Sequence, residues 1–168
     1  MLDLQGKVAF VFGVASEDSI AWAICQSLAE AGVTLYLGYQ KRFMSRVFQL
    51  KDKLPAIAGF YPLDVASDAD TKEFFDAFSK ENPGIKADIL IHAIGFAPRE
   101  CFDRPILFVD DESINTAYTI SANSLQRCLK FALPYLNPGS STITLTYAAS
   151  TRHVPSYGIM SMAKAALE

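Results

Sequence analysis

Residues 7–21 read KVAFVFGVASEDSIA, an apolar run that ends at Gly13 and is followed by a polar loop. The run predicts a buried strand over Lys7–Phe12, and Ser19 is a residue type that begins helices. Apolar residues at helical spacing then predict a helix over Ile20–Ala31, which Gly32 ends. The stretch therefore predicts a strand, a loop and a helix, which together make the first half of a βαβ unit.

The same alternation continues along the chain. We expect further strands over Val33–Leu37, Ile57–Leu63, Ala87–Ala93 and Thr142–Tyr147. We expect further helices over Arg42–Leu54, from Ser67 or Asp68 to Pro83, over Asp110–Leu136 and after Ser156, with Asn137-Pro138-Gly139 breaking the long helix. Such an alternation predicts an α/β fold in three α/β/α layers, a Rossmann-like doubly wound parallel sheet that forms one dinucleotide-binding domain over residues 1–168.

Composition excludes several classes of protein. The 168 residues are 51% hydrophobic, which suffices for an ordinary core. The net charge of -3 with scattered Lys and Arg predicts no basic face for nucleic acid. No apolar run reaches the ~20 residues that cross a bilayer, and Met1–Phe10 lacks the pattern of a signal peptide. We therefore predict a cytoplasmic protein that binds neither nucleic acid nor membrane.

The three cysteines, Cys25, Cys101 and Cys128, lie far apart and form no CxxC pair. This spacing predicts reduced, buried thiols rather than a disulfide framework or a metal site. A catalytic cysteine stays open as an alternative, because a histidine distant in sequence can be close in space. His92 is expected to be a packed strand residue and His153 an exposed loop residue, rather than catalysts.

The chain stops inside its last helix. The segment after Tyr157 ends at Glu168 with neither Gly nor Pro, and it places a carboxylate at the negative end of the helix dipole. We expect from this a chain truncated at its C-terminus, with further strands missing. Such a chain would leave one side of its sheet unpaired and would tend to associate.

Several residues follow strands at places where dinucleotide folds hold their ligand. Gly13 lets backbone amides approach a pyrophosphate, and Ser19 can cap the helix and donate to phosphate. Gln40 follows the second strand at the adenosine ribose position, and Asp64-Val65 follow the third at the adenine position. The loop is not G-x-G-x-x-G, so an ordinary strand-to-helix turn remains the alternative reading of it.

Tyr157 and Lys164 stand seven positions apart, which on a helix is two turns along one face. The pair can present a phenol and an ammonium to one bound molecule, an arrangement that suits reduction of a carbonyl-conjugated substrate. Taken singly, a tyrosine at an element end and a lysine on a helix are common in any α/β protein. Their occurrence together with the Gly13 loop favours an active site.

These motifs resemble the bacterial enoyl-acyl-carrier-protein reductases of the short-chain dehydrogenase/reductase superfamily, over essentially the whole chain. The resemblance rests on Gly13, Ser19-Ile20-Ala21, Tyr39-Gln40, Asp64-Val65-Ala66, His92–Pro98, Leu136–Ser140 and the block from Tyr147 through Tyr157 to Lys164-Ala165. Most short-chain dehydrogenases carry Tyr-x3-Lys, whereas here Met160 occupies that place and the tyrosine lies at position 157. The wider spacing favours reduction of a carbon-carbon double bond over alcohol oxidation.

The resemblance implies an oxidoreductase of fatty-acid biosynthesis that reduces the trans-2 double bond of an enoyl chain carried by acyl-carrier protein. It implies that Tyr157 donates a hydrogen bond to the thioester oxygen, that Lys164 binds the nicotinamide ribose and makes the phenol more acidic, and that Tyr147 positions substrate or relays a proton. It places Ile20, Ile94 and Gly95 at the cofactor, and Ala97 and Met160 at the substrate.

Cofactor choice and assembly are also implied by the resemblance. Gln40 without an acidic neighbour favours NADH, while Lys41 and Arg42 keep NADPH open. Relatives are typically homotetramers in which the long helix and the helix after Tyr157 form subunit interfaces. Two alternatives remain: another short-chain reductase acting on a ketone or alcohol, and a non-catalytic dinucleotide-binding module.

Overall fold

The computed structural model describes residues 4–168, which form a five-stranded sheet of order β3-β2-β1-β4-β5. All neighbouring strands pair in parallel. The strands are β1 Val8–Phe12, β2 Thr34–Tyr39, β3 Ile57–Pro62, β4 Ala87–His92 and β5 Leu136–Thr144. The helices are α1 Ile20–Glu30, α2 Met44–Phe48, α3 Asp68–Glu81, α4 Glu100–Asp103, α5 Asp111–Tyr118, α6 Ser124–Ala132 and α7 Gly158–Leu167. The predicted doubly wound fold is confirmed.

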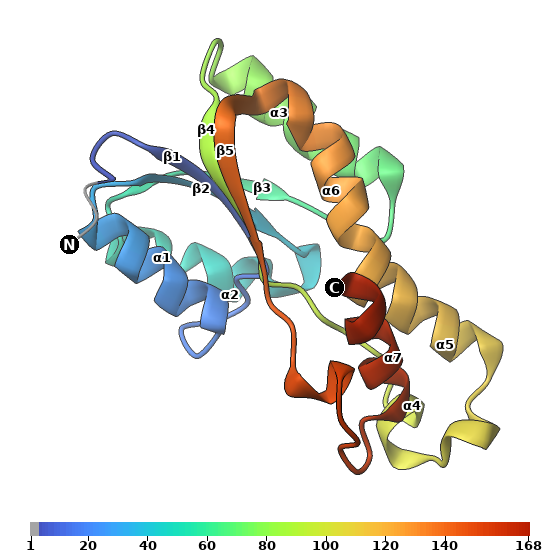
Figure 1. Cartoon of the computed structure of the whole chain (residues 1–168). Helices are drawn as coiled ribbons and strands as arrows, with labels where there is room; N and C mark the ends of the chain where they lie inside the picture. The colour runs from blue at the N-terminus through green and yellow to red at the C-terminus, as the bar shows by residue number, and fades with distance from the viewer. Residues whose placement is uncertain (1–3) are drawn as a thin grey trace.

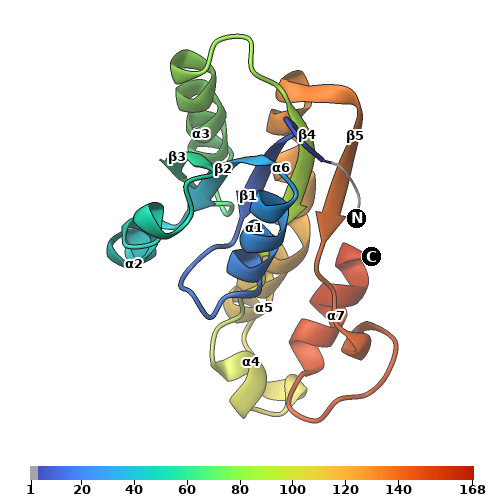
Figure 2. The same ribbon diagram turned by 90° about the vertical axis from the view of Figure 1, so that its left-hand side faces the viewer.

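The sheet lies between two layers of helices (Figures 1 and 2). Helices α1 and α2 cover one face, and α3 and α6 cover the other, with α5 and α7 continuing beyond the end of the sheet. Strands β3 and β5 form the two edges. No helix within residues 4–168 combines the length and the apolar character that a bilayer crossing requires.

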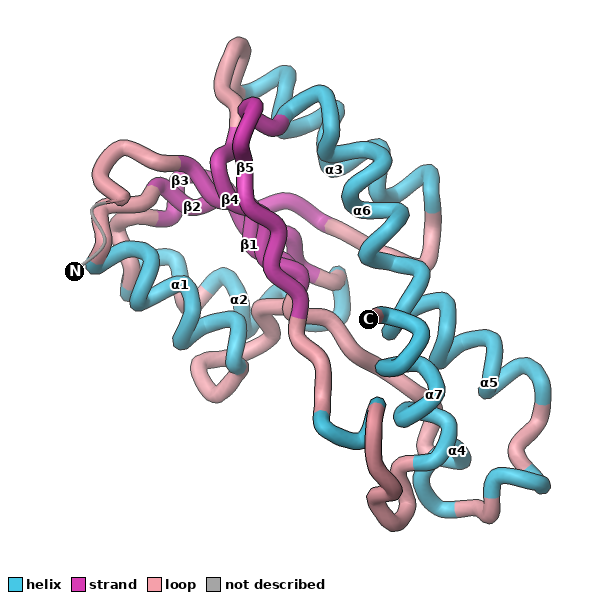
Figure 3. The backbone as a smooth tube through the Cα atoms, in the orientation of Figure 1, coloured by secondary structure: helices cyan, strands magenta, loops and turns pink. Residues whose placement is uncertain are grey.

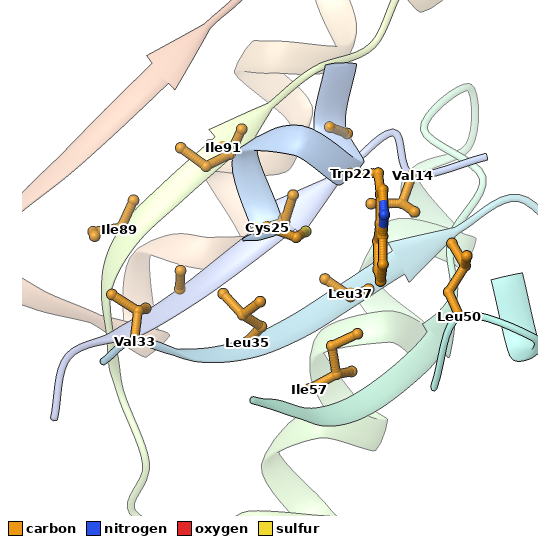
Figure 4. Close-up of a cluster of buried hydrophobic side chains, with 13 residues drawn as sticks. Val14, Trp22, Cys25, Val33, Leu35, Leu37, Leu50, Ile57, Ile89 and Ile91 are labelled. Atoms are coloured by element: carbon orange, nitrogen blue, oxygen red, sulfur yellow. The ribbon is translucent and has the colours of Figure 1, made fainter. Parts of the chain in front are cut away.

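Strand β1 shows why the central run of sequence is apolar throughout. Its successive side chains point to opposite faces, so Ala9 and Val11 enter the core under α1 while Phe10 and Phe12 enter the core under α3. The first core packs Trp22 and Cys25 of α1 onto side chains of β2 and β4 (Figure 4). The second core is mainly aromatic and sets Phe10 edge-to-face against Phe74, Phe75 and Phe78.

The register of the sheet brings the ends of its central strands level. Phe12 at the end of β1 pairs with Gly38 in β2 and with His92 at the end of β4. The loops that follow these strands therefore leave from one edge of the sheet, which is where ligands bind in open α/β folds. Figure 3 shows the loop after β4 and the connection from β5 to α7 leaving this edge together.

Two predicted helices differ in the structure. The helix expected over Arg42–Leu54 is broken into a 3₁₀ turn at Lys41–Phe43, the short α2 and a second 3₁₀ turn at Lys51–Lys53. Of the residues in these three segments only Val47 is buried, and no side chain caps their first turns. A segment that buries only Val47 and Leu50 and has no side-chain cap does not stabilise a continuous helix.

The long helix expected over Asp110–Leu136 is also interrupted. Helix α5 passes into a π-helical segment over Thr119–Asn123 before α6, and a 3₁₀ turn at Leu133–Tyr135 ends the run. Strand β5 then begins at Leu136, six residues earlier than expected, and ends at Thr144 rather than Tyr147. Asn137-Pro138-Gly139 thus lies inside this strand, where the missing N–H of proline is tolerated because β5 is an edge strand with a register shift against β4.

Candidate functional site

Two cavities lie at the carboxyl end of the sheet and share the segment Ala93–Phe96, which follows β4. The first has a volume of about 390 Å³ and is lined by the loops after β1, β2 and β3. The second has a volume of about 540 Å³ and is lined by residues of the β5–α7 connection and of α7. The segment Ala93–Phe96 therefore separates the two cavities, and we call it the wall.

Gly13 brings the loop after β1 against this wall. Its φ is +107°, a conformation that favours glycine, and a Cβ added there would lie 2.1 Å from the carbonyl oxygen of Ala93. The obstacle is backbone, so it cannot move aside as a flexible side chain would. The close approach joins the β1 loop to the β4 loop.

Several of the residues predicted to contact a dinucleotide line the first cavity. Gln40, Asp64 and Val65 line it, as do Ile94 and Gly95 of the shared wall. The Asp64 carboxylate accepts a hydrogen bond of 2.9 Å from the backbone N–H of Ala66, which holds the loop after β3 in a tight turn. The first cavity is thus lined by residues that follow four different strands, β1, β2, β3 and β4.

Arg42 also lines the first cavity, in the broken segment after β2. Its guanidinium carbon lies 4.7 Å from the centre of the Phe43 ring and 5.3 Å from that of Phe96. These cation-π contacts hold a positive charge over one end of the cavity. The aromatic partner Phe96 was not predicted as a site residue, although it directly follows the predicted Gly95.

Ser19 and Ile20 have different positions from those expected for cofactor residues. The Ser19 hydroxyl oxygen accepts from the Trp22 N–H and caps α1, as predicted, but its proton is donated to the Ser16 carbonyl at 2.7 Å. Ser19 lines neither cavity, so the expected donation to phosphate has no free proton in this structure. Ile20 is 67% exposed and lines the second cavity.

The second cavity gathers both predicted active-site tyrosines. The rings of Tyr147 and Tyr157 meet edge-to-face with their centres 5.0 Å apart, and Phe102 lies 5.8 Å from Tyr157 on another side. Ala97 and Met160, the predicted substrate residues, line the same cavity. Tyr157 is the residue just before α7 rather than within it, with a non-helical φ of −116°. Both tyrosines therefore line the cavity from the connection between β5 and α7.

Lys164 places a cation in the second cavity although it is only 6% exposed. Its ammonium donates to the Leu145 carbonyl at 2.8 Å and lies 3.5 Å from the Ile94 carbonyl. Burial lowers the pKa of Lys164. A Cβ on Gly95 would come within 3.4 Å of the lysine nitrogen, so Gly95 leaves room for the cation beside the shared wall.

The expectation of an acidic phenol at Tyr157 is wrong for this structure. Burial raises the pKa of Tyr157, and the neighbouring Tyr147 raises it further. The phenol therefore keeps its proton at neutral pH. A protonated phenol is a hydrogen-bond donor, which is the form that the predicted role of Tyr157 needs.

The histidines and cysteines offer no second catalytic group. His92 is fully buried between Thr144 and Ser124, and burial together with the charge of Lys164 lowers its pKa to about 4. His153 is exposed. Burial raises the pKa of Cys25 and Cys128 to about 12 and raises that of Cys101, so none is a ready thiolate. Within residues 4–168 no cluster of three metal-ligating side chains is present.

Comparison with known proteins gives consistent results. The family model described as enoyl-(acyl carrier protein) reductase matches residues 13–168. The enoyl-acyl-carrier-protein reductase (NADH) of Synechocystis sp. is 39% identical over all of this chain, which spans 66% of that protein's length.

Two solved structures share the fold. The reductase of Bacillus cereus, solved with NADP⁺, superposes with a TM-score of 0.93 at 33% identity, over 99% of this chain and 65% of its own. The reductase of Anaplasma phagocytophilum, solved with NAD, superposes with a TM-score of 0.90 at 27% identity, over 98% of this chain and 62% of its own. The match of the family model, the sequence and the fold shows that this chain belongs to the enoyl-(acyl carrier protein) reductase family.

Proposed function

We propose that this protein acts as an enoyl-acyl-carrier-protein reductase that uses NADH. One observation carries the proposal: Tyr147, Tyr157 and Lys164 line one cavity, which shares the wall Ala93–Phe96 with a second cavity lined by Gly13, Gln40 and Asp64-Val65. A group held in the first cavity can thus react with a molecule held in the second. The chain spans less than two thirds of the length of the relatives named above.

The donor set of the first cavity fits a dinucleotide. Gly13 gives a backbone approach that a Cβ would block, Gln40 can bond a ribose hydroxyl, and Asp64-Val65 provide polar backbone and an apolar side chain for adenine. Lys164, across the shared wall, would bind the nicotinamide ribose. When bound, NADH supplies a hydride to the β-carbon of a trans-2-enoyl thioester.

Tyr157 would stabilise the charge that develops on the thioester oxygen. Its raised pKa keeps the phenol protonated, and the cavity is apolar around it, so one hydrogen bond to that oxygen is strong. A donor of this kind contributes ~3 kcal/mol of transition-state stabilisation. Tyr147, which packs against the Tyr157 ring, would orient the phenol or relay a proton to it.

The proposed partner is an acyl-carrier protein bearing the enoyl chain, in the last step of a fatty-acid elongation cycle. We also propose a homotetramer, and the exposed apolar side chains of Leu107 and Phe108 support an assembly that covers them. The free, buried thiols support a reducing compartment, the cytoplasm. NADPH is a second candidate cofactor, because Arg42 lies over the first cavity.

The test is reduction of crotonyl-CoA, followed as loss of nicotinamide absorbance with NADH and with NADPH. We expect turnover with NADH, and we expect Tyr157→Phe to lower kcat by ~100- to 1000-fold. Tyr118→Phe is the matched control, because Tyr118 lines neither cavity. NADH binding without turnover would favour the non-catalytic module, and turnover of a ketone instead would favour another short-chain reductase.

A further inference from the structure

The π-helical segment Thr119–Asn123 presents a buried serine to the wall between the two cavities. Ser121 is 0% exposed. Its hydroxyl donates to the Phe96 carbonyl at 2.7 Å and accepts from the Phe96 N–H at 2.8 Å. One side chain therefore satisfies both backbone groups of a single loop residue, 25 positions away in sequence.

Phe96 is the last residue of the wall. It lines both cavities, and its ring lies 5.3 Å from the Arg42 guanidinium of the first. A loop residue has no strand partner to fix its backbone, so its two polar groups need another source of hydrogen bonds. Ser121 supplies both of them and thereby sets the position of the Phe96 backbone.

Two neighbours of Ser121 line the two cavities, one cavity each. Ile120, the preceding residue of the π-helical segment, lines the first cavity. Met160 of α7 lines the second, and its sulfur lies 3.6 Å from the Ser121 hydroxyl oxygen. The serine is thus in contact with the loop after β4 and with α7, the two elements that carry the facing sides of the second cavity.

Ser124 offers an internal comparison. It is equally buried and lies three residues further along the same helical run. Its hydroxyl donates to the Ile120 carbonyl at 2.6 Å and pairs with Nε2 of His92 at 2.8 Å. His92 lies at the end of β4 and lines neither cavity. Ser124 therefore links the helical run to β4 through His92, whereas Ser121 links it to the wall through Phe96.

We propose that Ser121 is a positioning residue: through its paired hydrogen bonds to Phe96 it holds the wall that aligns a bound dinucleotide with a bound enoyl thioester. This assignment rests on the proposed function for its catalytic consequence, although the anchoring itself does not. The π-helical segment that carries Ser121 agrees with this role, because π-bulges inside α-helices are frequent at functional sites.

The direct test measures amide hydrogen exchange at Phe96 in the whole chain. We expect Ser121→Ala to speed exchange there by roughly fivefold to tenfold, because a protecting hydrogen bond is lost. Ser124→Ala, the matched control, should leave exchange at Phe96 within twofold while loosening the end of β4. Equal exchange at Phe96 in Ser121→Ala and the unaltered protein would overturn the proposal.

The functional test uses NADH and crotonyl-CoA. Because small misplacements of reacting groups cost rate more than affinity, we expect Ser121→Ala to lower kcat by roughly 10- to 100-fold and to change the KM for crotonyl-CoA by less than threefold. Ser124→Ala should keep kcat within twofold. Equal losses of kcat in the two variants would mean a general loss of stability and would contradict a positioning role.

Two further observations keep the outcomes separate. Ser121→Cys keeps a weak donor and acceptor at the same place and should restore part of the protection and of kcat, which a variant that merely packs badly would not do. If the unaltered protein neither binds NADH nor reduces crotonyl-CoA, the proposed function fails, while the exchange measurement still decides whether Ser121 anchors Phe96.

Discussion

The two cavities on either side of the Ala93–Phe96 wall are built in different ways. The first is lined mainly by short loops that directly follow β1, β2 and β3, and in one of these loops the Gly13 backbone lies against the Ala93 carbonyl. The second is formed by individual side chains that α7 and the β5–α7 connection bring to the wall from about 50 to 70 positions later in the chain, as the Lys164 contact with Ile94 illustrates.

The difference teaches which changes each cavity can absorb. The first cavity depends on the chain path at Gly13, where an added Cβ would meet the backbone of Ala93. A side-chain cavity keeps its shape when a functional group is removed and loses only the chemistry of that group. Substitutions can therefore separate the binding of a dinucleotide from the reaction proposed at the tyrosines.

The largest effect is expected where the first cavity depends on the chain path. Gly13→Ala should lower the affinity for NADH by ~100-fold or more, because the new Cβ meets the Ala93 carbonyl at 2.1 Å and the residue must keep a positive φ. Calorimetric titration with NADH measures this change. Gly84→Ala is the matched control, since Gly84 also has a positive φ of +81° but no atom within 4 Å of its added Cβ.

Gly84→Ala should therefore show only the backbone penalty, a loss of about 1–2 kcal/mol in the free energy of unfolding. Its affinity for NADH should be unchanged. If both glycine variants lost NADH binding to the same degree, the close approach at Gly13 would not be what shapes the first cavity.

The next effect concerns the free energy of unfolding, which depends on pH through the buried His92 at the end of β4. The pKa of His92 is about 4 in the fold and 6.5 as a free side chain. As pH falls below 6.5 the unfolded chain takes up a proton that the folded chain refuses, so stability is lost between pH 6.5 and about 4 and not further below. The shift corresponds to about 3 kcal/mol.

Urea unfolding at a series of pH values measures this loss, and His92→Gln should remove that part of the pH dependence. Carboxylates such as Asp88 and Asp110, whose pKa values are lowered, contribute to the slope in both proteins and cancel in the difference. Identical slopes in the two proteins would show that His92 does not stay neutral in the fold.

A smaller effect is expected where the second cavity holds its cation. Lys164→Met should lower kcat/KM with NADH and crotonyl-CoA by roughly 10- to 100-fold, because the cation at the wall is lost, while the apolar stem still fills its space. The fold should persist, as judged by circular dichroism. Lys130→Met serves as control, because Lys130 is exposed and lines neither cavity. Similar losses in the two variants would argue against a specific role of Lys164.

The smallest effect concerns the choice between NADPH and NADH in the first cavity, which Arg42 lines. Arg42→Ala should weaken NADPH binding by about tenfold, the value of one lost charge-assisted hydrogen bond to a 2′-phosphate. Binding of NADH, which has no such phosphate, should change by less than threefold. Equal weakening of both cofactors would assign Arg42 to packing against Phe43 and Phe96 instead.

Much of this protein follows from its sequence. The apolar strands, the Gly13 turn and the Ser19 cap are local signals, and they correctly predicted the strand-helix alternation and hence the parallel sheet. Positions directly after strands also predicted the lining of the first cavity, because in such a fold the carboxyl ends of parallel strands meet at one edge. Tyr157 and Lys164 also line one cavity, although Tyr157 lies before α7 and not on the same helix face as the spacing predicted.

Tertiary structure alone decided the rest. Apolar spacing over Asp110–Leu136 cannot distinguish an α-helix from one with a π-helical turn, and that turn accompanies the Ser121 contact with Phe96. The raised pKa of Tyr157 arises from burial and from Tyr147. The Ser19 proton is taken by Ser16 within a folded loop. Local sequence determines which elements form and where their loops gather, whereas hydrogen-bond partners and pKa values depend on groups that only the packed chain brings together.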